Sequence, residues 1–332
     1  MSFTRLQRHP SRRDFALATA ATLLLPALPA SAQEFPKKPI TLIVGFAAGG
    51  STDASARIIA KKLQSNLGLT VTVDNRGGAG GNIAHQIVSR AEPDGSVILL
   101  GSIGPLTIAR HLTAKLGYDP QKDLAPLCMG AVFPNVLVVH AGLGVKTLAE
   151  YIARAKKEPG KLDYASTGPG SASHLAGELF NQRAGVEIVH VPYKGGAPAM
   201  TDLLGGRVAA YFAAPPTAMP HIQTGKLIPI AVSGPTRLAN LPNVPTVAES
   251  GFPGFDATNW YAFVAPAKTP EPILKRWNQE LVKAMNDPEV RDELVKHGLT
   301  PQPGTREELA RYIDTESKKW AQVIKERRIT AD

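Results

Sequence analysis

The sequence predicts an α/β protein whose two lobes hold one small anion between them. Strand-like runs alternate with helical ones along the 332 residues, which is the pattern of open α/β sheets. In each half of the chain an apolar strand leads through a loop of small residues into a helix. These strands are Ile40–Val44 and Leu162–Ala165. One such unit in each half suggests one lobe in each half.

The two loops, Gly45–Asp53 and Tyr164–His174, are predicted anion sites. Bare backbone before a helix leaves free N–H groups at the positive end of the helix dipole. Neither loop contains Lys or Arg, and a site that binds through backbone N–H groups needs none. The alternative is that each loop is a Gly-rich turn without a ligand, since single motif matches carry a false-positive risk. The presence of a pair favours the anion site.

The other elements of the first lobe follow the same order of strand, loop and helix. They are strands at Leu69–Asp74 and Val97–Leu100, small-residue loops at Asn75–Asn82 and Gly101–Gly104, a helix ending at Ala91, and a turn at Glu92–Gly95.

The run Val136–Val139 predicts the crossover into the second lobe. Thr147–Glu150 has the form of a capping box that opens a helix. The further elements are strands at Val186–Val191, Ala209–Phe212 and Leu227–Val232, a short helix over Ala199–Leu204, irregular Pro-rich chain at Pro235–Pro253, and a return to the first lobe at Trp260–Ala265.

Three helices are predicted at the C-terminal end. Thr269-Pro270 starts the first, with Pro at the first helical position, and Pro288 starts the second. Thr305–Glu308 is a second capping box, and it opens a charged amphipathic helix.

The first 32 residues predict an export signal. Four arginines make a basic start, and Phe15–Ala30 is apolar but too short for a membrane span. Ala30-Ser31-Ala32 is a cleavage site that leaves Gln33 as the first residue. Arg12-Arg13 before Phe15 fits the twin-arginine pattern, although paired arginines also occur in general secretory signals.

Composition narrows the class of partner. The net charge of +9 falls to +6 when four Arg and Asp14 leave with the signal, and the excess is spread without a basic run. This predicts no nucleic-acid partner and no polybasic membrane patch. Cys128 is the only cysteine, so no internal disulfide can form. Its apolar neighbours favour a buried structural thiol over a reactive one.

Catalytic, nucleotide and metal motifs are missing. The sequence has no Gly-x-Ser-x-Gly elbow, Walker A or Gly-x-Gly-x-x-Gly fingerprint, so no cofactor is expected. His174 and Glu178 lie one helical turn apart but have no third ligand nearby in sequence, so no metal site is expected. A catalytic carboxylate pair drawn from Asp53, Asp74, Asp94 and Asp202 stays open, although each residue also suits a helix or turn position.

An ordered set of segments resembles the periplasmic receptors of tripartite tricarboxylate transporters, the Bug-type solute-binding proteins. The segments are Phe35–Ile40, Gly45–Asp53, Val73–Gly81, Pro93–Gly95, Tyr118–Pro120, Tyr164–His174, His190–Gly195 and Val244–Glu249. The resemblance covers essentially all of the mature chain. It implies a type II periplasmic-binding-protein fold, with two Rossmann-like lobes joined by two crossover strands. The implied limits are 1–32 for the signal peptide, 33–134 plus 260–332 for lobe 1, and 135–259 for lobe 2.

The resemblance also implies where a ligand binds, because members of the family hold a small carboxylate between the lobes, largely through loop backbone and ordered water. Carried over by position, the contacts are Phe46, Ala48, Gly49, Gly50, Ser51 and Thr52 in the first lobe and Ser166, Thr167, Gly168, Ser171 and His174 in the second, with Ser102 and Lys194 as weaker candidates. This chain has Ala48 where the family usually has Pro, so the first loop is expected to be less rigid. It also has Gly77 where Pro is common.

The leading hypothesis is a periplasmic receptor, monomeric and without catalytic residues, that captures a small carboxylate. It would deliver the ligand to membrane permease subunits of a tripartite transporter or present it to a sensor kinase. The rival is an exported serine hydrolase acting on a small carboxylate ester or amide through Ser166 or Ser171. Neither serine has an elbow motif or a base–orienter pair beyond His174, which favours the receptor. The lobes are expected to close at hinges near Val136–Val139 and Asn259–Phe263.

Overall fold

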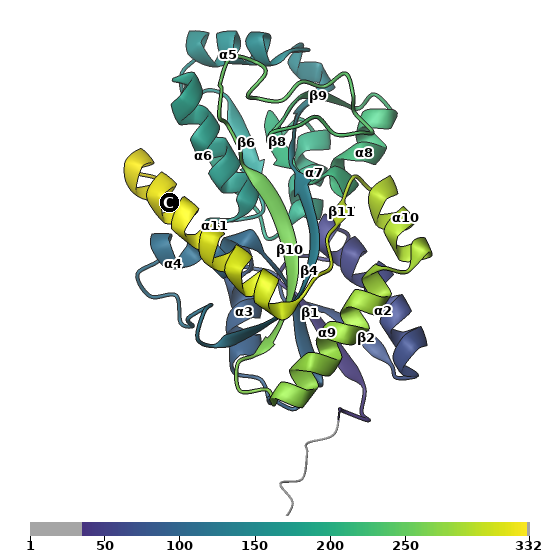
Figure 1. Ribbon diagram of the computed structural model, residues 1–332. Coiled ribbons are helices and arrows are strands. Elements are labelled where there is room, and N and C mark those ends of the chain that lie inside the picture. The colour runs from purple at the N-terminus through teal and green to yellow at the C-terminus, as the bar shows by residue number, and fades with distance from the viewer. Residues whose placement is uncertain (1–34, 331–332) are drawn as a thin grey trace, which may run out of the picture. The chain divides into compact units, whose positions relative to one another are not determined.

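The computed structural model describes residues 35–330 and arranges them in two sheets with flanking helices (Figure 1). The first sheet takes its strands from both ends of this range, and the second sheet takes its strands from the middle. Within residues 35–330, no helix combines the length and the apolar character needed to cross a membrane. The predicted signal peptide and its cleavage site lie outside the described residues.

The six-stranded sheet has the order β11-β4-β10-β3-β1-β2. Its strands are β1 (Ile40–Val44), β2 (Val71–Asn75), β3 (Val97–Ser102), β4 (Leu124–Pro134), β10 (Thr258–Pro266) and β11 (Thr300–Pro301). β1 runs parallel to both β2 and β3, whereas β10 is antiparallel to β3 and β4. A strand between parallel neighbours is covered on both faces, which explains the continuous apolar run of β1.

The five-stranded sheet has the order β7-β6-β8-β5-β9. Its strands are β5 (Val136–His140), β6 (Asp163–Ser166), β7 (Val189–Pro192), β8 (Ala210–Ala213) and β9 (Leu227–Val232). β6 is parallel to β7 and β8, and β5 is antiparallel to β8 and β9. Both sheets are therefore mixed, and the two together form the predicted two-lobed α/β fold.

Helices cover the sheets and connect the parallel strands. They are α2 (Ser51–Leu67), α3 (Asn82–Ser89), α4 (Ala109–Leu112), α5 (Leu148–Lys157), α6 (Ala172–Ala184), α7 (Gly196–Leu204), α8 (Pro215–Gln223), α9 (Glu271–Met285), α10 (Pro288–Lys296) and α11 (Arg306–Arg327), with short turns η1 (Ala79–Gly81), η2 (Gly104–Ile108) and η3 (Ala141–Leu143). The long helix α11, yellow in Figure 1, packs on β4, η2 and α4.

The chain passes between the sheets at two places that lie side by side. Asn135 is the single residue between β4 and β5. On the return path, the Ala257 N–H donates to the Ser233 carbonyl at 2.8 Å. The segments Val136–Val139 and Asn259–Phe263, near which the hinges are predicted, pair within the second and first sheets, respectively. The crossing points are thus Asn135 and the residues just before Asn259.

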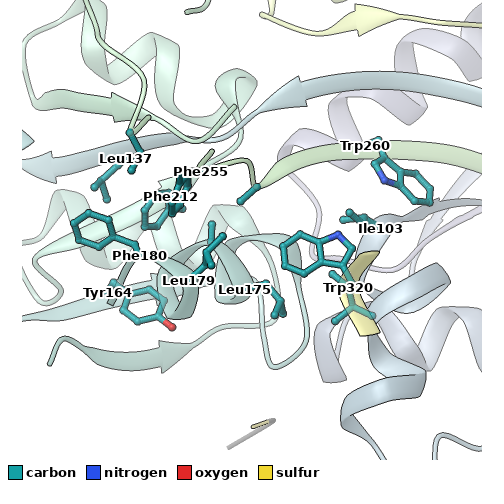
Figure 2. Packing of buried hydrophobic residues seen from close by; sticks show 14 of the residues in the cluster. Ile103, Leu137, Tyr164, Leu175, Leu179, Phe180, Phe212, Phe255, Trp260 and Trp320 are labelled. Carbon is teal, nitrogen blue, oxygen red and sulfur yellow. The ribbon is translucent and has the colours of Figure 1, made fainter. Parts of the chain in front are cut away.

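Aromatic side chains join the helices to the sheets. Phe180 of α6 packs edge-on against Phe212 of β8, with ring centroids 6.0 Å apart, and Trp260 of β10 packs edge-on against Tyr312 of α11 at 5.5 Å. Figure 2 shows Phe180 and Phe212 on one side of this core and Trp260 with Trp320 on the other. Burial of each large apolar side chain contributes about 1.5–3 kcal/mol, so the fold is stable without disulfides.

Cys128 is the structural thiol that its apolar neighbours predict. It lies in β4 and is fully buried. Burial raises the pKa of the thiol to about 11, so the sulfur stays protonated and unreactive at neutral pH.

Two of the longer elements are not predicted by the sequence analysis. Strand β4 is eleven residues long, but its Pro126 and Gly130 hide the strand pattern. Helix α8 contains Pro215, Pro216 and Pro220, a composition that argues against a helix. The first two prolines occupy the first turn, where a missing N–H costs nothing, so the helix forms despite them.

Several predicted boundaries and caps differ in detail from the structure, and three examples follow. Strand β7 begins at Val189 rather than Val186. Pro270 is the N-cap of α9 and does not occupy its first helical position. Thr147 caps α5 by accepting from the Glu150 N–H at 3.2 Å, but the Glu150 carboxylate accepts from Lys146 and not from Thr147. Only half of that capping box forms, whereas the box at Thr305–Glu308 is complete.

Candidate ligand-binding site

A cavity lies where the loops of the two sheets meet. It holds about 440 Å³ of space free of protein atoms, part of which is open to solvent. The centre of a water-sized molecule can occupy only about 30 Å³ of this space, so the cavity is narrow. Its lining comprises Phe46, Gly50, Ser51, Thr52, Ser102, Asn135, Thr167, Ala172, Ser173, Gly196, Tyr211, Phe212, Ala214, Thr217, Asn259 and Tyr261.

Helices from both sheets begin at this cavity. Ser51 and Thr52 open α2, Ala172 and Ser173 open α6, and Gly196 opens α7. Neither α2 nor α7 has a side chain that caps its first turn. The first N–H groups of a helix have no partner inside the helix, and the helix dipole adds a partial positive charge there. The cavity therefore presents several N–H donors from different directions.

Helix α8 also begins at the cavity, where Ala214 is its N-cap. Its first two residues are prolines, which carry no N–H. It therefore contributes its dipole and the side chain of Thr217, which lines the cavity, more than backbone donors.

No Lys, Arg, Asp or Glu of the described chain lines the cavity. Aromatic residues such as Phe46 and Phe212 supply apolar walls, and Ser, Thr and Asn supply the polar side chains. A site with converging helix N-termini and no acidic side chain attracts anions. Because the site has no cation either, its attraction comes from oriented dipoles rather than from an ion pair.

The first loop is held by Asp53, which lies outside the cavity lining. Its carboxylate accepts from the Gly49 N–H at 2.9 Å and pairs with Arg57 at 2.9 Å. Burial raises the pKa of Asp53, but the bonds from Arg57 and Gly49 outweigh it and lower the pKa below its ordinary value. Asp53 therefore stays ionised and fixes the turn that leads into α2.

The second loop is held by Ser166 and His174, which do not line the cavity. Ser166 Oγ lies 2.6 Å from His190 Nε2 and accepts from the Gly168 N–H at 3.0 Å. His174 Nδ1 accepts from the Gly170 N–H at 3.1 Å, and its ring stacks on His190 with centroids 4.1 Å apart. Both side chains are almost fully buried.

The pKa of His174 is lowered to about 3, mainly by burial and then by His190. The imidazole is thus neutral in the folded chain and titrates near its ordinary pKa when unfolded. Protonation of the unfolded chain removes stability as pH falls below about 6.5.

Replacing His174 with Asn should therefore flatten the acid side of the stability profile, because the Asn oxygen can still accept from Gly170. Between about pH 7.5 and pH 5 we expect the variant to lose about 2 kcal/mol less unfolding free energy than the wild type. Urea unfolding at both pH values measures this difference. His85, whose pKa burial lowers to about 4, contributes equally to both proteins. Equal pH dependence in the two proteins would refute the assignment.

Backbone contacts close one lobe on the other around the cavity. The Ala47 N–H donates to the Lys194 carbonyl at 3.1 Å. A Cβ atom at Gly80 would lie 2.1 Å from the Pro169 oxygen, and one at Gly104 would lie 2.6 Å from the Gly170 oxygen. These glycines let the backbones of the two lobes touch, and the structure is a closed form.

The predicted contact residues divide into two groups. Those that line the cavity are Phe46, Gly50, Ser51, Thr52, Ser102 and Thr167. Those that do not line it are Ala48, Gly49, Ser166, Gly168, Ser171, His174 and Lys194.

Members of the second group make contacts within and between the loops. Ala48 and Gly49 are exposed. The Lys194 carbonyl accepts the hydrogen bond from the Ala47 N–H between the lobes. Ser171 is the N-cap of α6, where its hydroxyl accepts from the His174 N–H. Ser166, Gly168 and His174 hold the turn from inside.

Sequence reasoning misses ten lining residues, chiefly from β8, α8 and the crossing points. These are Asn135, Ala172, Ser173, Gly196, Tyr211, Phe212, Ala214, Thr217, Asn259 and Tyr261. The loop Pro192–Gly196 before α7 is a strand-to-helix loop of small residues and could have signalled Gly196. Nothing local marks Asn135 or Asn259, because only the sheet topology brings them together.

Glu178, which the sequence analysis considers together with His174, has a different hydrogen-bond partner. Glu178 accepts from the Tyr164 hydroxyl at 2.6 Å and does not join His174 in a metal site. Residues 35–330 contain no cluster of three or more His, Cys, Asp or Glu that could hold a metal ion.

Comparison with known proteins gives a consistent result. Residues 55–329 match the family model described as "Tripartite tricarboxylate transporter family receptor". Protein BugT of Bordetella pertussis is 38% identical over 301 residues, which cover 90% of this chain and 92% of BugT.

Two solved structures extend the likeness. Rpa4515 of R. palustris, solved with adipate, has 35% identity and a TM-score of 0.86, with 90% of this chain and 99% of that chain covered. MatC of Rhodopseudomonas palustris, solved with bound malate, has 32% identity and a TM-score of 0.84, with 87% and 100% covered.

Proposed function

Because this chain belongs to the receptor family of the tripartite tricarboxylate transporters, we propose that it captures a small carboxylate in the cavity between its lobes. The observation that carries the proposal is the convergence of the α2, α6 and α7 N-termini on a cavity lined by no charged side chain. Such a site stabilises a carboxylate through backbone N–H groups. Phe46, Gly50, Ser51, Thr52, Ser102 and Thr167 are its proposed contacts from the sequence.

The chain is a binding protein and not an enzyme. The Ser166–His190 pair has the spacing of a nucleophile and a base, but Ser166 is fully buried and its hydroxyl is outside the cavity. Its hydroxyl also accepts from Gly168, which fits a role in loop geometry. The relatives are solute-binding receptors, and the hydrolase alternative has no support.

The ligand of two relatives, adipate in one and malate in the other, indicates the chemical class. We propose small dicarboxylates of this kind as ligands, with tripartite permease subunits or a sensor kinase as the partner that receives the loaded, monomeric receptor. The lobe limits 33–134 plus 260–332 and 135–259 are also proposals, which the sheet membership of the strands supports.

We propose that the receptor works in the periplasm after removal of residues 1–32. Family membership supports this location, since the relatives are periplasmic binding proteins. Arg12-Arg13 and the Ala30-Ser31-Ala32 site support export through a cleaved twin-arginine signal.

Native mass spectrometry of protein released from the periplasm tests the function and the location together. We expect a protein mass that starts at Gln33 and, in gently ionised samples, an additional mass that matches a small organic acid. Added adipate or malate should raise the melting temperature without being consumed, because ligand binding stabilises the folded state. A panel of mono- and dicarboxylates that leaves the melting temperature unchanged, or that is turned over, would overturn the proposal.

A further inference from the structure

Asn135 occupies an unusual position in the cavity. It is the residue at which the chain crosses from one sheet to the other, it is 1% exposed, and it lines the cavity. Its Nδ2 group is fully buried and has no hydrogen-bond partner among the residues that the structure describes. A buried amide N–H that stays unpaired costs free energy, so a bound partner is the expected explanation.

A chain of hydrogen bonds fixes which side-chain atom of Asn135 lacks a partner. The Trp260 N–H can only donate, and it bonds the Asn259 oxygen at 2.8 Å. The Asn259 Nδ2 must then point the other way, and it donates to the Asn135 oxygen at 3.3 Å. This leaves the Asn135 Nδ2 as the unpaired atom. Because Asn135 lines the cavity, its unpaired group is a donor beside the cavity, which suits an acceptor atom on a ligand.

The backbone holds this donor rigidly. The Asn135 N–H donates to Ser233 Oγ at 2.9 Å, and that hydroxyl donates to the Ala257 carbonyl at 3.0 Å. The Ser233 N–H returns a bond to the Asn135 carbonyl at 2.9 Å. The backbone of Asn135 is thus tied to both crossing points between the lobes.

We infer that Asn135 binds a second acceptor group of the ligand, apart from the carboxylate held by the helix N-termini, and so selects bifunctional acids. A carboxylate has two oxygens with about four acceptor positions, and the N–H groups of three helices can fill these. The Asn135 donor lies at the crossover between the sheets and not at a helix N-terminus. It is therefore free to bind a second acceptor group of the ligand. The inference rests on the proposed function and names the group that sets its specificity.

Pairs of acids that differ only in the second carboxylate test the inference by calorimetry. The probes are adipate against hexanoate and succinate against butyrate, with wild type, Asn135→Ala and Asn66→Ala. Asn66 is the matched control, because its Nδ2 is also buried and unpaired but lies outside the cavity lining. Circular dichroism and melting temperature establish that each variant is folded.

Wild type should bind the preferred diacid at least about tenfold more tightly than the matching monoacid, as expected for one buried hydrogen bond. Asn135→Ala should reduce this preference to about threefold or less, while Asn66→Ala should keep it. A merely structural defect would weaken diacid and monoacid alike and leave the ratio unchanged.

The inference is overturned if Asn135→Ala keeps the wild-type ratio of diacid to monoacid affinity, or if the wild type does not prefer the diacid. Either result leaves the proposed receptor function unaffected. Wild type that binds none of the four acids, nor any other carboxylate of the panel above, overturns the proposed function and this inference with it. If Asn135→Ala does not fold, Asn135→Ser replaces it under the same criteria, since its shorter hydroxyl cannot reach as far.

Discussion

Replacing Gly50 with Asp is expected to weaken carboxylate binding strongly while leaving the fold intact. Gly50 is the N-cap of α2, with extended backbone (φ −86°, ψ 175°) and no side-chain cap. A Cβ atom there would meet the Ala47 oxygen at 3.5 Å, an ordinary contact, so a side chain fits. An Asp at an N-cap accepts from the first N–H groups of its helix, which are the donors proposed for the ligand.

The added carboxylate competes with the ligand in two ways. It occupies the N–H groups of the first turn, and it repels the ligand's charge by about 4 kcal/mol at a separation of about 4 Å in a partly buried site. We expect affinity to fall by about a hundredfold or more for the acid found by native mass spectrometry. The melting temperature should hold or rise, because Asp is a better N-cap than Gly.

Gly50→Ala is the control for this experiment, since it adds the Cβ atom without an acceptor and should bind within about threefold of wild type. Wild-type affinity in a folded Gly50→Asp protein would exclude the α2 N-terminus from the site. Loss of binding in both variants would show instead that the loop tolerates no side chain.

The parts of this molecule that follow local rules could be predicted from the sequence. An apolar run predicts strand β1, the paired glycines predict the loop after it, and a 3.6-residue period predicts helix α2. The same reasoning finds β6 and α6, and the complete capping box at Thr305 marks the start of α11. These elements carry Phe46, Gly50, Ser51, Thr52 and Thr167 to the cavity.

The rest of the site depends on which strands become neighbours, and no local pattern records that. Asn135 and Asn259 are 124 positions apart, and they meet because β4 pairs with β10. Ser166 and His174 are among the ligand contacts that the resemblance implies, and these contacts are expected largely through loop backbone. In the structure Ser166 and His174 turn inward and satisfy the backbone of their own loop, because a tight Gly-Pro-Gly turn has N–H groups that helices and strands leave unpaired.

Replacing Gly80 with Ala is expected to hold the lobes apart. Gly80 has left-handed backbone (φ 63°, ψ 19°), and its added Cβ would lie 2.1 Å from the Pro169 oxygen of the other lobe. Non-bonded heavy atoms attract at about 3.5–4.0 Å and repel strongly at shorter range, so the closed form cannot accommodate this atom without moving the backbone. The obstacle is a carbonyl of the main chain, which has no alternative rotamer.

Gly68 provides the matched control for that variant. It has nearly the same backbone conformation (φ 66°, ψ 20°) at the C-cap of α2, and an added Cβ would meet nothing within 4 Å. Both Ala variants therefore incur the left-handed strain of about 1–2 kcal/mol, but only the one at Gly80 obstructs contact between the lobes. Comparison of the two variants therefore separates an effect on lobe closure from a general loss of stability.

We expect Gly80→Ala to bind the acid about a hundredfold more weakly than Gly68→Ala, because the ligand must contact donors from both lobes and the closed form that brings them together is disfavoured. Small-angle scattering at saturating acid should give a larger radius of gyration for Gly80→Ala than for wild type or Gly68→Ala. Equal affinity and equal scattering in the two Ala variants would mean that binding does not require the Gly80–Pro169 contact. In that case, the membrane partner would have to recognise the loaded receptor by a feature other than the contact between Gly80 and Pro169.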